Sequence, residues 1–212
     1  WEIYERWCYL QVVGMMKTIY PDLQWIYRWP GSRVDVIRCE GRTTDTQVDV
    51  WLQVRCPAFD QPPSHGFSSI SGERRPDIVV TVSSPAGRSF IVIDAKYRVG
   101  REWVLEGMES AHLYRDCLRW EGRKPDLSVL LVPRGGGAPL LETMKYRKDN
   151  GVGVAVLSAE KNGLHEVLRS CWTGSPDLES GEHPMDSDPG FHSLRYAPPC
   201  ADEADSPSQR RD

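Results

Sequence analysis

The chain has 212 residues, a formal net charge of −4 and a hydrophobic fraction of 40%. This length and apolar fraction suit one domain with a sizeable core. The sequence contains no run of about 18 apolar residues and no basic-then-apolar leader, so it gives no argument for a membrane or secreted protein. The six cysteines form no Cys-x-x-Cys pair, which argues against zinc or a disulfide framework and favours reduced thiols in the cytoplasm.

The first predicted element is an amphipathic helix over residues 1–20, because apolar side chains recur there every three or four positions. Pro21 and Asp22 end this helix. The chain opens on Trp1, already inside the helical pattern and without an initiator methionine. We therefore expect the chain to be the carboxyl-terminal portion of a longer protein, with an amino-terminal region that is missing here.

An early β-hairpin follows the helix. Its strands are predicted over residues 33–39 and 47–56, with a polar connection over residues 40–43. Residues 58–72 are dense in Pro, Ser and Gly, which predicts a loop.

The central feature of the sequence is a second hairpin. Residues 75–80 and 90–97 are apolar, β-branched runs of strand length, and residues 84–87 between them have turn chemistry. If the turn is centred between Pro85 and Ala86, paired residues have numbers that sum to 171. Asp77 then faces Asp94, with Cβ atoms roughly 5 Å apart.

These two aspartates predict a site. Like charges that face each other across strands are destabilising, and a divalent cation is the simplest way to neutralise them. The two-residue alternation of a strand places Lys96 on the face of Asp94. The leading third carboxylate is Glu5 on the opening helix, and Glu2, one turn earlier, is the fallback. This set suits Mg²⁺-assisted phosphodiester hydrolysis, with the lysine positioning the attacking water or stabilising developing charge.

The later part of the chain alternates helices and strands. A helix is predicted over residues 106–120 and another over residues 164–172. Short buried strands are predicted over residues 127–133 and 151–159, and a glycine-rich loop over residues 134–137. Hairpins first and alternating elements later predict an α/β fold with a mixed sheet flanked by helices.

The predicted domain boundary lies near residue 174. Residues 175–212 contain nine acidic residues, three basic residues and six prolines, which is typical of a disordered acidic tail. Without this tail, the predicted domain over residues 1–174 has a formal net charge of +2. A nearly neutral domain gives no sign of nucleic-acid binding through its bulk charge.

The residues of the predicted site resemble a known family. Pro76-Asp77 followed by Asp94-Ala95-Lys96 resembles the signature of the PD-(D/E)XK nuclease superfamily. The segments 4–7, 94–98 and 112–116 resemble its McrC-like branch, whose members are carboxyl-terminal nuclease domains of restriction and defence proteins. The resemblance extends over about residues 1–172.

This resemblance implies a restriction-endonuclease-like core and Mg²⁺-dependent cleavage of DNA, with Mn²⁺ as a substitute ion. It implies catalytic roles for Asp77, Asp94 and Lys96, and Glu5 matches the helix glutamate of the branch, so the implied metal ligands are Asp77, Asp94 and Glu5. In McrC-like systems an AAA+ motor drives the reaction. An AAA+ NTPase subunit and the missing amino-terminal region are therefore expected partners, and would supply much of the affinity for DNA.

Four further residues are candidates for nucleic-acid contact, namely His112, Tyr114, Arg115 and Arg98. The first three lie on the predicted helix over residues 106–120, where they either contact phosphate or pack the helix on the sheet. Three functions compete: an active DNA endonuclease, an inactive nuclease-fold scaffold or nucleic-acid-binding module, and a nuclease that acts on RNA or on ends. The presence of every expected carboxylate and of the lysine favours activity.

Overall fold

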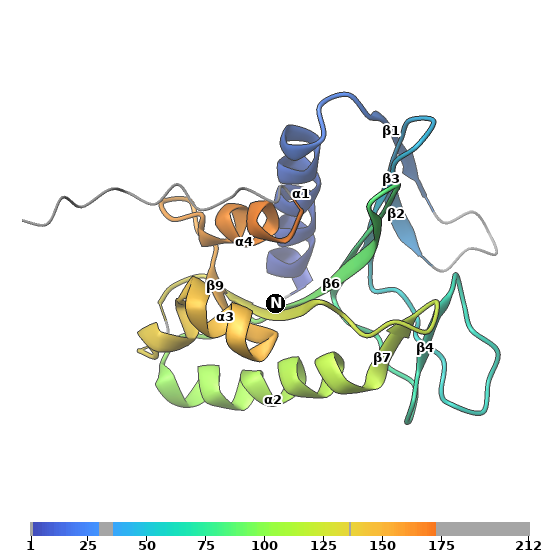
Figure 1. Ribbon diagram of the computed structural model, residues 1–212. Helices are drawn as coiled ribbons and strands as arrows, with labels where there is room; N and C mark the ends of the chain where they lie inside the picture. The colour runs from blue at the N-terminus through green and yellow to red at the C-terminus, as the bar shows by residue number, and fades with distance from the viewer. Residues whose placement is uncertain (1, 30–35, 136, 173–212) are drawn as a thin grey trace, which may run out of the picture. The chain divides into compact units, whose positions relative to one another are not determined.

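The computed structural model describes residues 2–29, 36–135 and 137–172, which form a mixed sheet with helices on both of its faces (Figure 1). The helices are α1 (Glu2–Ile19), α2 (Arg101–Cys117), α3 (Met144–Asn150) and α4 (Gly163–Trp172), with a short 3-10 helix η1 (Pro139–Glu142). The strands are β1 (Gln24–Arg28), β2 (Ile37–Arg42), β3 (Gln47–Leu52), β4 (Phe67–Ser69), β5 (Ile78–Ser84), β6 (Gly87–Ala95), β7 (Leu118–Trp120), β8 (Leu127–Val132) and β9 (Val152–Val156).

The main sheet has seven strands in the order β1-β2-β3-β5-β6-β8-β9. The first five strands pair antiparallel, whereas β6, β8 and β9 pair parallel. Strands β4 and β7 form a separate antiparallel pair. The predicted fold class is therefore confirmed, with an early hairpin added to a mixed sheet that helices flank.

The central hairpin has the predicted register. Ile78 pairs with Ile93 at one end, and Ser84 pairs with Gly87 next to the turn, so the numbers of paired residues sum to 171. This register extends outward to Asp77, which directly precedes β5, and Asp94, which lies in β6. The two-residue turn at Pro85 and Ala86 fixes this register, because a slip by one residue would turn every apolar side chain to the wrong face.

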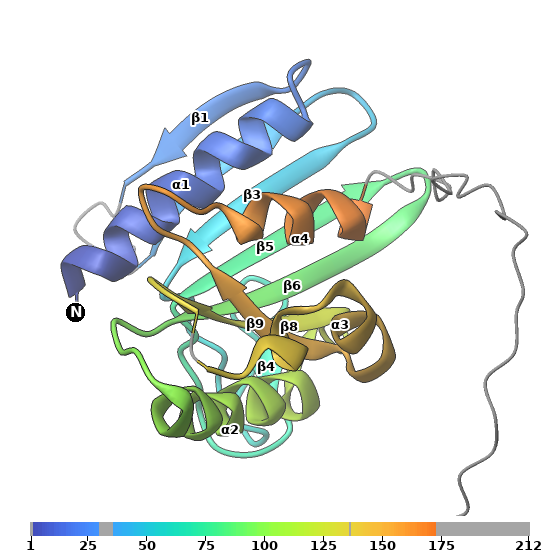
Figure 2. The same ribbon diagram turned by 90° about the vertical axis from the view of Figure 1, so that its left-hand side faces the viewer.

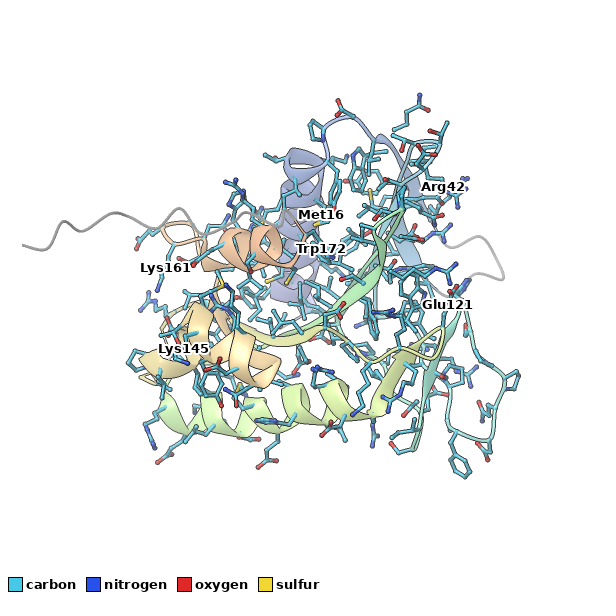
Figure 3. All side chains as sticks on the ribbon, in the orientation of Figure 1. Met16, Arg42, Glu121, Lys145, Lys161 and Trp172 are labelled. Atoms are coloured by element: carbon cyan, nitrogen blue, oxygen red, sulfur yellow. The ribbon has the colours of Figure 1, made fainter. Side chains whose placement is uncertain are left out.

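Helices α1 and α4 cover one face of the sheet and lie side by side (Figure 2). Met16 of α1 and Trp172 of α4 pack in the same apolar cluster against β3, β5 and β6 (Figure 3). The indole nitrogen of Trp172 also donates a hydrogen bond to Ser89 Oγ at 2.8 Å. This packing fixes the position of α1, and with it the position of Glu5 in the first turns of that helix.

Helix α2 covers the other face over β8 and β9, where Val104, Met108 and Ala111 pack against the strands. Gly107 allows the close approach, because a Cβ at this position would lie 2.8 Å from Leu130 Cδ2. The β4–β7 pair covers the remaining part of this face with a cluster of aromatic side chains.

Several predicted bounds differ from the structure. The second long helix begins at Arg101 and ends at Cys117, because the next three residues form β7 and pair with β4. Strand β4 lies inside the predicted loop over residues 58–72, and β1 and α3 were not predicted from the sequence. Part of the predicted strand over residues 33–39, and the tail over residues 175–212, lie outside the described residues. Among the described residues, no helix has the length and apolar character needed to cross a membrane.

Candidate functional site

The predicted site residues meet at one edge of the sheet. Because β3 and β6 both run antiparallel to β5, the end of β3, the beginning of β5 and the end of β6 lie together. The backbone is joined here by a hydrogen bond from Gln53 N to Asp77 O at 2.7 Å. A second bond runs from Lys96 N to Leu131 O at 2.9 Å. The edge is thus rigid backbone rather than a free loop, which suits a site that must hold its geometry.

Each aspartate is held by one contact. Asp77 Oδ2 accepts a hydrogen bond from the backbone nitrogen of Ala95 at 2.8 Å. Asp94 Oδ1 accepts one from Lys96 Nζ at 3.1 Å, and this contact is also an ion pair. Each carboxylate therefore keeps its other oxygen for a further partner.

Two of the carboxylate oxygens at this edge are buried without a hydrogen bond. The side chains of Asp94 and Glu5 are 1% and 3% exposed, and neither Asp94 Oδ2 nor Glu5 Oε1 has a hydrogen-bond partner. A buried charged oxygen without a partner is costly, and native structures rarely contain one without a reason. These two atoms indicate a ligand that supplies positive charge.

The electrostatics of the edge agree with this inference. Burial, followed by the charges of Asp94 and Glu5, raises the pKa of Asp77 to about 8, although Lys96 and the Ala95 amide oppose the change. Burial also raises the pKa of Glu5, against the opposing effect of a hydrogen bond from the Gln53 side chain. Burial lowers the pKa of Lys96, but the carboxylates of Asp94 and Asp77 outweigh it and the net change is upward. Lys96 thus interacts electrostatically with three carboxylates, those of Asp94, Asp77 and Glu5.

The donor set fits a small divalent cation. Mg²⁺ prefers carboxylate oxygens and keeps several waters or substrate oxygens, so it needs only one or two carboxylates from the protein. Asp77 and Asp94 offer this number, and the unpartnered oxygen of Glu5 adds a third donor nearby. Among residues 2–29, 36–135 and 137–172, no group of three or more His, Cys, Asp or Glu side chains is arranged to hold a metal ion. A site built on only two protein carboxylates would leave coordination positions for water and for a phosphate.

A cleft of about 390 Å³ opens beside these groups. Its walls come from the end of β6 and from the facing turns of α2. The lining residues are Asp77, Ala95, Lys96, Tyr97, Arg98, Trp103, Glu106, Gly107 and Ser110. A substrate in this cleft would contact Asp77 and Lys96 directly.

The four candidates for nucleic-acid contact divide into two groups. Arg98 lines the cleft, and Tyr114 continues the helix face formed by Gly107 and Ser110. Tyr114 does not itself line the cleft, because it packs half-buried against the aromatic cluster on this face of the sheet. Burial, followed by the charges of Asp94 and Asp77, raises the pKa of Tyr114.

The structure does not bring the other two to the cleft. Arg115 packs against Gly151, where a Cβ would lie 2.5 Å from Arg115 Nε. Gly151 precedes β9, and because β6 and β9 run parallel, it lies at the edge opposite Asp94. His112 is exposed on another side of α2. The two residues are neighbours of Tyr114 in sequence, but the helix turns them away.

Gln53 also belongs to this edge of the sheet, although no sequence pattern predicted it. This residue follows β3 with a φ of 52°, a left-handed conformation that is uncommon for residues other than glycine. Its backbone binds Asp77, and its side chain is a hydrogen-bonding neighbour of Glu5. Strained backbone often occurs at functional sites. No sequence signal marks the position, because glutamine has no preference for this conformation.

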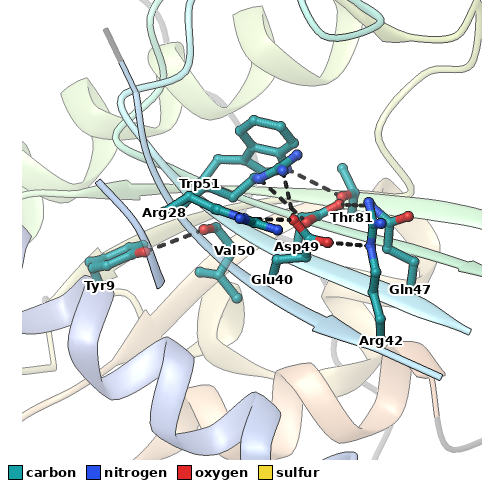
Figure 4. A network of polar contacts seen from close by, with 10 residues as sticks. Tyr9, Arg28, Glu40, Arg42, Gln47, Asp49, Val50, Trp51 and Thr81 are labelled. Carbon is teal, nitrogen blue, oxygen red and sulfur yellow. Dashed lines mark hydrogen bonds and ion pairs between the residues drawn. The ribbon is translucent and has the colours of Figure 1, made fainter. Parts of the chain in front are cut away.

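A second group of buried carboxylates lies on the same sheet, in β2 and β3 (Figure 4). The carboxylate of Glu40 forms ion pairs with three guanidinium groups, Arg28 Nε at 3.5 Å, Arg38 at 2.7 Å and Arg42. Asp49 Oδ2 accepts a hydrogen bond from Gln47 at 2.6 Å, and its Oδ1 lies 3.7 Å from Arg38 Nε. Glu40 is thus matched by cations that belong to the chain itself. Asp49 Oδ1, like Asp94 Oδ2 and Glu5 Oε1, is buried without a hydrogen bond, but it lies within ion-pair distance of Arg38.

Comparison with known proteins agrees with the geometry at the edge of the sheet. A family described as the PD-(D/E)XK nuclease superfamily matches residues 2–126, a range that contains Glu5, Asp77, Asp94 and Lys96. Proteins of this superfamily generally use divalent metal ions. No curated protein and no solved structure matches the chain.

Proposed function

Because the chain belongs to the PD-(D/E)XK nuclease superfamily, we propose that it is a metal-dependent endonuclease that hydrolyses phosphodiester bonds of DNA. The observation that carries the proposal is the pair of buried, unpartnered oxygens on Asp94 and Glu5 beside a single lysine. An inactive scaffold has no need to keep this unbalanced charge, since neutral residues would stabilise the same edge. The unmatched carboxylates therefore favour an active enzyme over a scaffold.

Each residue has a distinct role in the proposed reaction. Asp77 and Asp94 hold Mg²⁺, and Glu5 supports them from α1. When bound, the ion supplies Lewis-acid stabilisation of the phosphate and lowers the pKa of a bound water. Lys96, which contacts Asp94 Oδ1 and also lines the cleft, orients the attacking water or stabilises the charge that develops on the phosphate.

The McrC-like resemblance supports a finer proposal. Tyr4-Glu5-Arg6-Trp7 lies at the beginning of α1, and Asp94-Ala95-Lys96 ends β6 and continues beyond it. We therefore place the chain in a restriction or anti-phage defence system, where an AAA+ NTPase and an amino-terminal region supply DNA affinity. The near-neutral charge of residues 1–174 supports the proposal that other parts of the system supply most of the affinity for DNA.

The test is nicking or linearisation of supercoiled DNA with Mg²⁺, with Mn²⁺ and with a chelator. We expect metal-dependent cleavage by the wild type and none by Asp94→Ala. If the chain alone is silent, the same assay is repeated with the proposed amino-terminal region or AAA+ motor added. Inactivity of that complex on every DNA and RNA substrate would favour the scaffold.

Thermal unfolding with and without Mg²⁺ tests the metal site independently of cleavage. The ion should raise the melting temperature of the wild type, since it binds only the folded state. The increase should be much smaller in Asp94→Asn, which keeps the shape of the side chain and loses its charge. An equal increase in both proteins, or no increase in the wild type, would count against a metal site at this edge.

A further inference from the structure

Two exposed aromatic side chains share the cleft with the proposed catalytic groups. Tyr97 and Trp103 are 65% and 47% exposed, and both line the cleft together with Asp77 and Lys96. Single exposed apolar residues are common on protein surfaces and need no explanation. Tyr97 and Trp103 are not isolated in this way, because both rings lie in one cleft beside the carboxylates and the lysine. Exposed apolar surface at the place where a substrate would bind indicates a role in binding.

Contacts with neighbouring residues position both rings without covering them. The ring of Tyr97 lies 5.3 Å from the ring of Tyr4, with an interplanar angle of 57°. The guanidinium group of Arg98 lies 4.3 Å from the centre of the Trp103 ring. Both rings are thus supported on one side and exposed to solvent elsewhere, which reduces the entropic cost of binding a flat partner.

The chemistry of the cleft defines this partner. Lys96 and Arg98 supply positive charge for phosphate groups, whereas the rings offer flat apolar surfaces. In a paired duplex the bases stack on each other, so their faces are not available to a protein side chain. Unpaired bases stack on aromatic side chains regardless of their sequence, and this contact is a main source of affinity for single strands.

We propose that Tyr97 and Trp103 form a base-stacking subsite, so that the strand held at the carboxylates carries an unpaired base next to the scissile phosphate. The preferred substrate is then single-stranded DNA, or duplex DNA with a bubble or an overhang. This inference rests on the proposed nuclease function. Arg98 lies 4.0 Å from Glu106, which also lines the cleft, but both side chains are more than half exposed, so Arg98 can turn to a phosphate of the same strand.

Binding is measured first, under conditions in which cleavage is off. The 212-residue chain is mixed with single-stranded oligonucleotides that contain 2-aminopurine, in a chelating buffer. Stacking on a ring should quench the fluorescence of this base. The double variant Tyr97→Leu/Trp103→Leu should lose the quenching and bind about 5- to 100-fold more weakly, the range expected for the loss of base stacking.

Two controls separate stacking from damage to the fold. Phe59→Leu removes an aromatic ring that is 74% exposed and does not line the cleft, so it should leave both quenching and affinity unchanged. The variant Tyr97→Phe/Trp103→Phe keeps two rings and should keep most of the quenching. Loss of quenching in the leucine variant with its retention in the phenylalanine variant supports the subsite, and equal quenching in all of them overturns it.

Cleavage rates then separate this inference from the proposed function. The wild type should cut single-stranded and bubble substrates at least about tenfold faster than a fully paired duplex, and the leucine variant should lose this preference. Equal rates on paired and unpaired DNA would overturn the subsite but leave the nuclease intact. Absence of cleavage, with ring-dependent quenching retained, would instead overturn the nuclease and leave a single-strand binding site.

Discussion

The two groups of buried carboxylates in this sheet differ in what neutralises them. Glu40 and Asp49 in β2 and β3 are about as buried as Asp94 and Glu5 at the sheet edge. The carboxylate of Glu40 contacts three arginines, whereas Lys96 is the only cation hydrogen-bonded to Asp94 among the described residues. Burial alone therefore does not identify a functional carboxylate. The informative feature is a buried charge that the chain leaves unbalanced.

This difference has an energetic consequence. Loss of one partner of a buried ion pair leaves the other partner uncompensated, and this is strongly destabilising. At the sheet edge the carboxylates repel each other. Lys96, the ion-pair partner of Asp94, is 42% exposed and still has Asp77 and Glu5 nearby, so loss of Asp94 relieves repulsion in the metal-free protein without leaving a buried cation uncompensated. The same kind of substitution should thus have opposite effects on stability at the two places.

The largest expected effect on stability is that of Glu40→Ala. We expect a loss of about 3 kcal/mol in the free energy of unfolding, near the low end for a broken buried pair, because Arg28 and Arg42 are half exposed and regain water. Denaturant unfolding measures this loss, and Asp94→Ala in metal-free buffer is the matched comparison. Asp94→Ala should be neutral or stabilising. A similar loss in both variants would remove the distinction between the two groups.

The next effect concerns catalysis by Lys96. In Lys96→Ala the rate of DNA cleavage should fall by about 10²-fold or more, the scale of deleting one preorganised electrostatic contact. The Mg²⁺-dependent rise in melting temperature should remain, since an ammonium group is not a metal ligand and its removal takes away a repulsive charge. Arg42→Ala, which removes a cation from the Glu40 group, should leave the cleavage rate per folded molecule unchanged. Full activity in Lys96→Ala would exclude the lysine from the mechanism.

The sequence predicted the central hairpin well because its information is local. A two-residue turn and two β-branched strands determine the pairing of residues only 17 positions apart, and Asp77 and Asp94 follow from it. The sequence could not show which cations neutralise Glu40. One of them, Arg28, lies in β1, and the sequence of this strand has no clear alternation of apolar and polar residues that would predict a strand. The sequence also could not show that Gln53 has a left-handed backbone. Both features depend on tertiary packing rather than on local preference.

Helix α2 also shows that a sequence pattern alone does not determine which side chains reach the site. His112, Tyr114 and Arg115 are adjacent in sequence, and the family resemblance treats them as one motif. The helical rotation separates them, so that Tyr114 continues the helix face of Gly107 and Ser110 that lines the cleft, and Arg115 packs against Gly151. A motif on a helix thus predicts a common site only for residues three or four positions apart.

A third prediction concerns pH. The pKa of Asp77 is about 8 in the folded protein, above the ordinary value of 3.8 that it takes when unfolded. Its contribution to the stability of the metal-free protein is therefore fully present below pH 3.8 and is lost as the pH rises towards 8. Burial raises the pKa of Glu5 and of Asp49 in the same direction. Asp77→Asn removes the contribution of Asp77 alone. The melting temperature of this metal-free variant should therefore fall less than that of the wild type between pH 3.8 and pH 8.

Mg²⁺ should reverse the trend, because the ion binds carboxylates only when they are deprotonated. The rise in melting temperature caused by Mg²⁺ should therefore be larger at pH 8 than at pH 5 in the wild type. In Glu40→Ala the metal-dependent rise should keep the same pH dependence, although the protein is less stable throughout. A rise that is independent of pH would contradict the coupling of the metal to Asp77.

The smallest expected effect is that of Glu5→Gln. Glu5 is buried, whereas Glu2, one turn earlier on the same helix, is exposed, so the structure favours Glu5 as the third carboxylate. Because Asp77 and Asp94 remain, the variant should keep part of the metal-dependent rise in melting temperature, more than Asp94→Asn keeps. Glu2→Gln is the matched control and should behave as the wild type. If Glu5→Gln leaves the rise unchanged, Glu5 belongs with Glu40 as a structural carboxylate, and the metal is held by the hairpin alone.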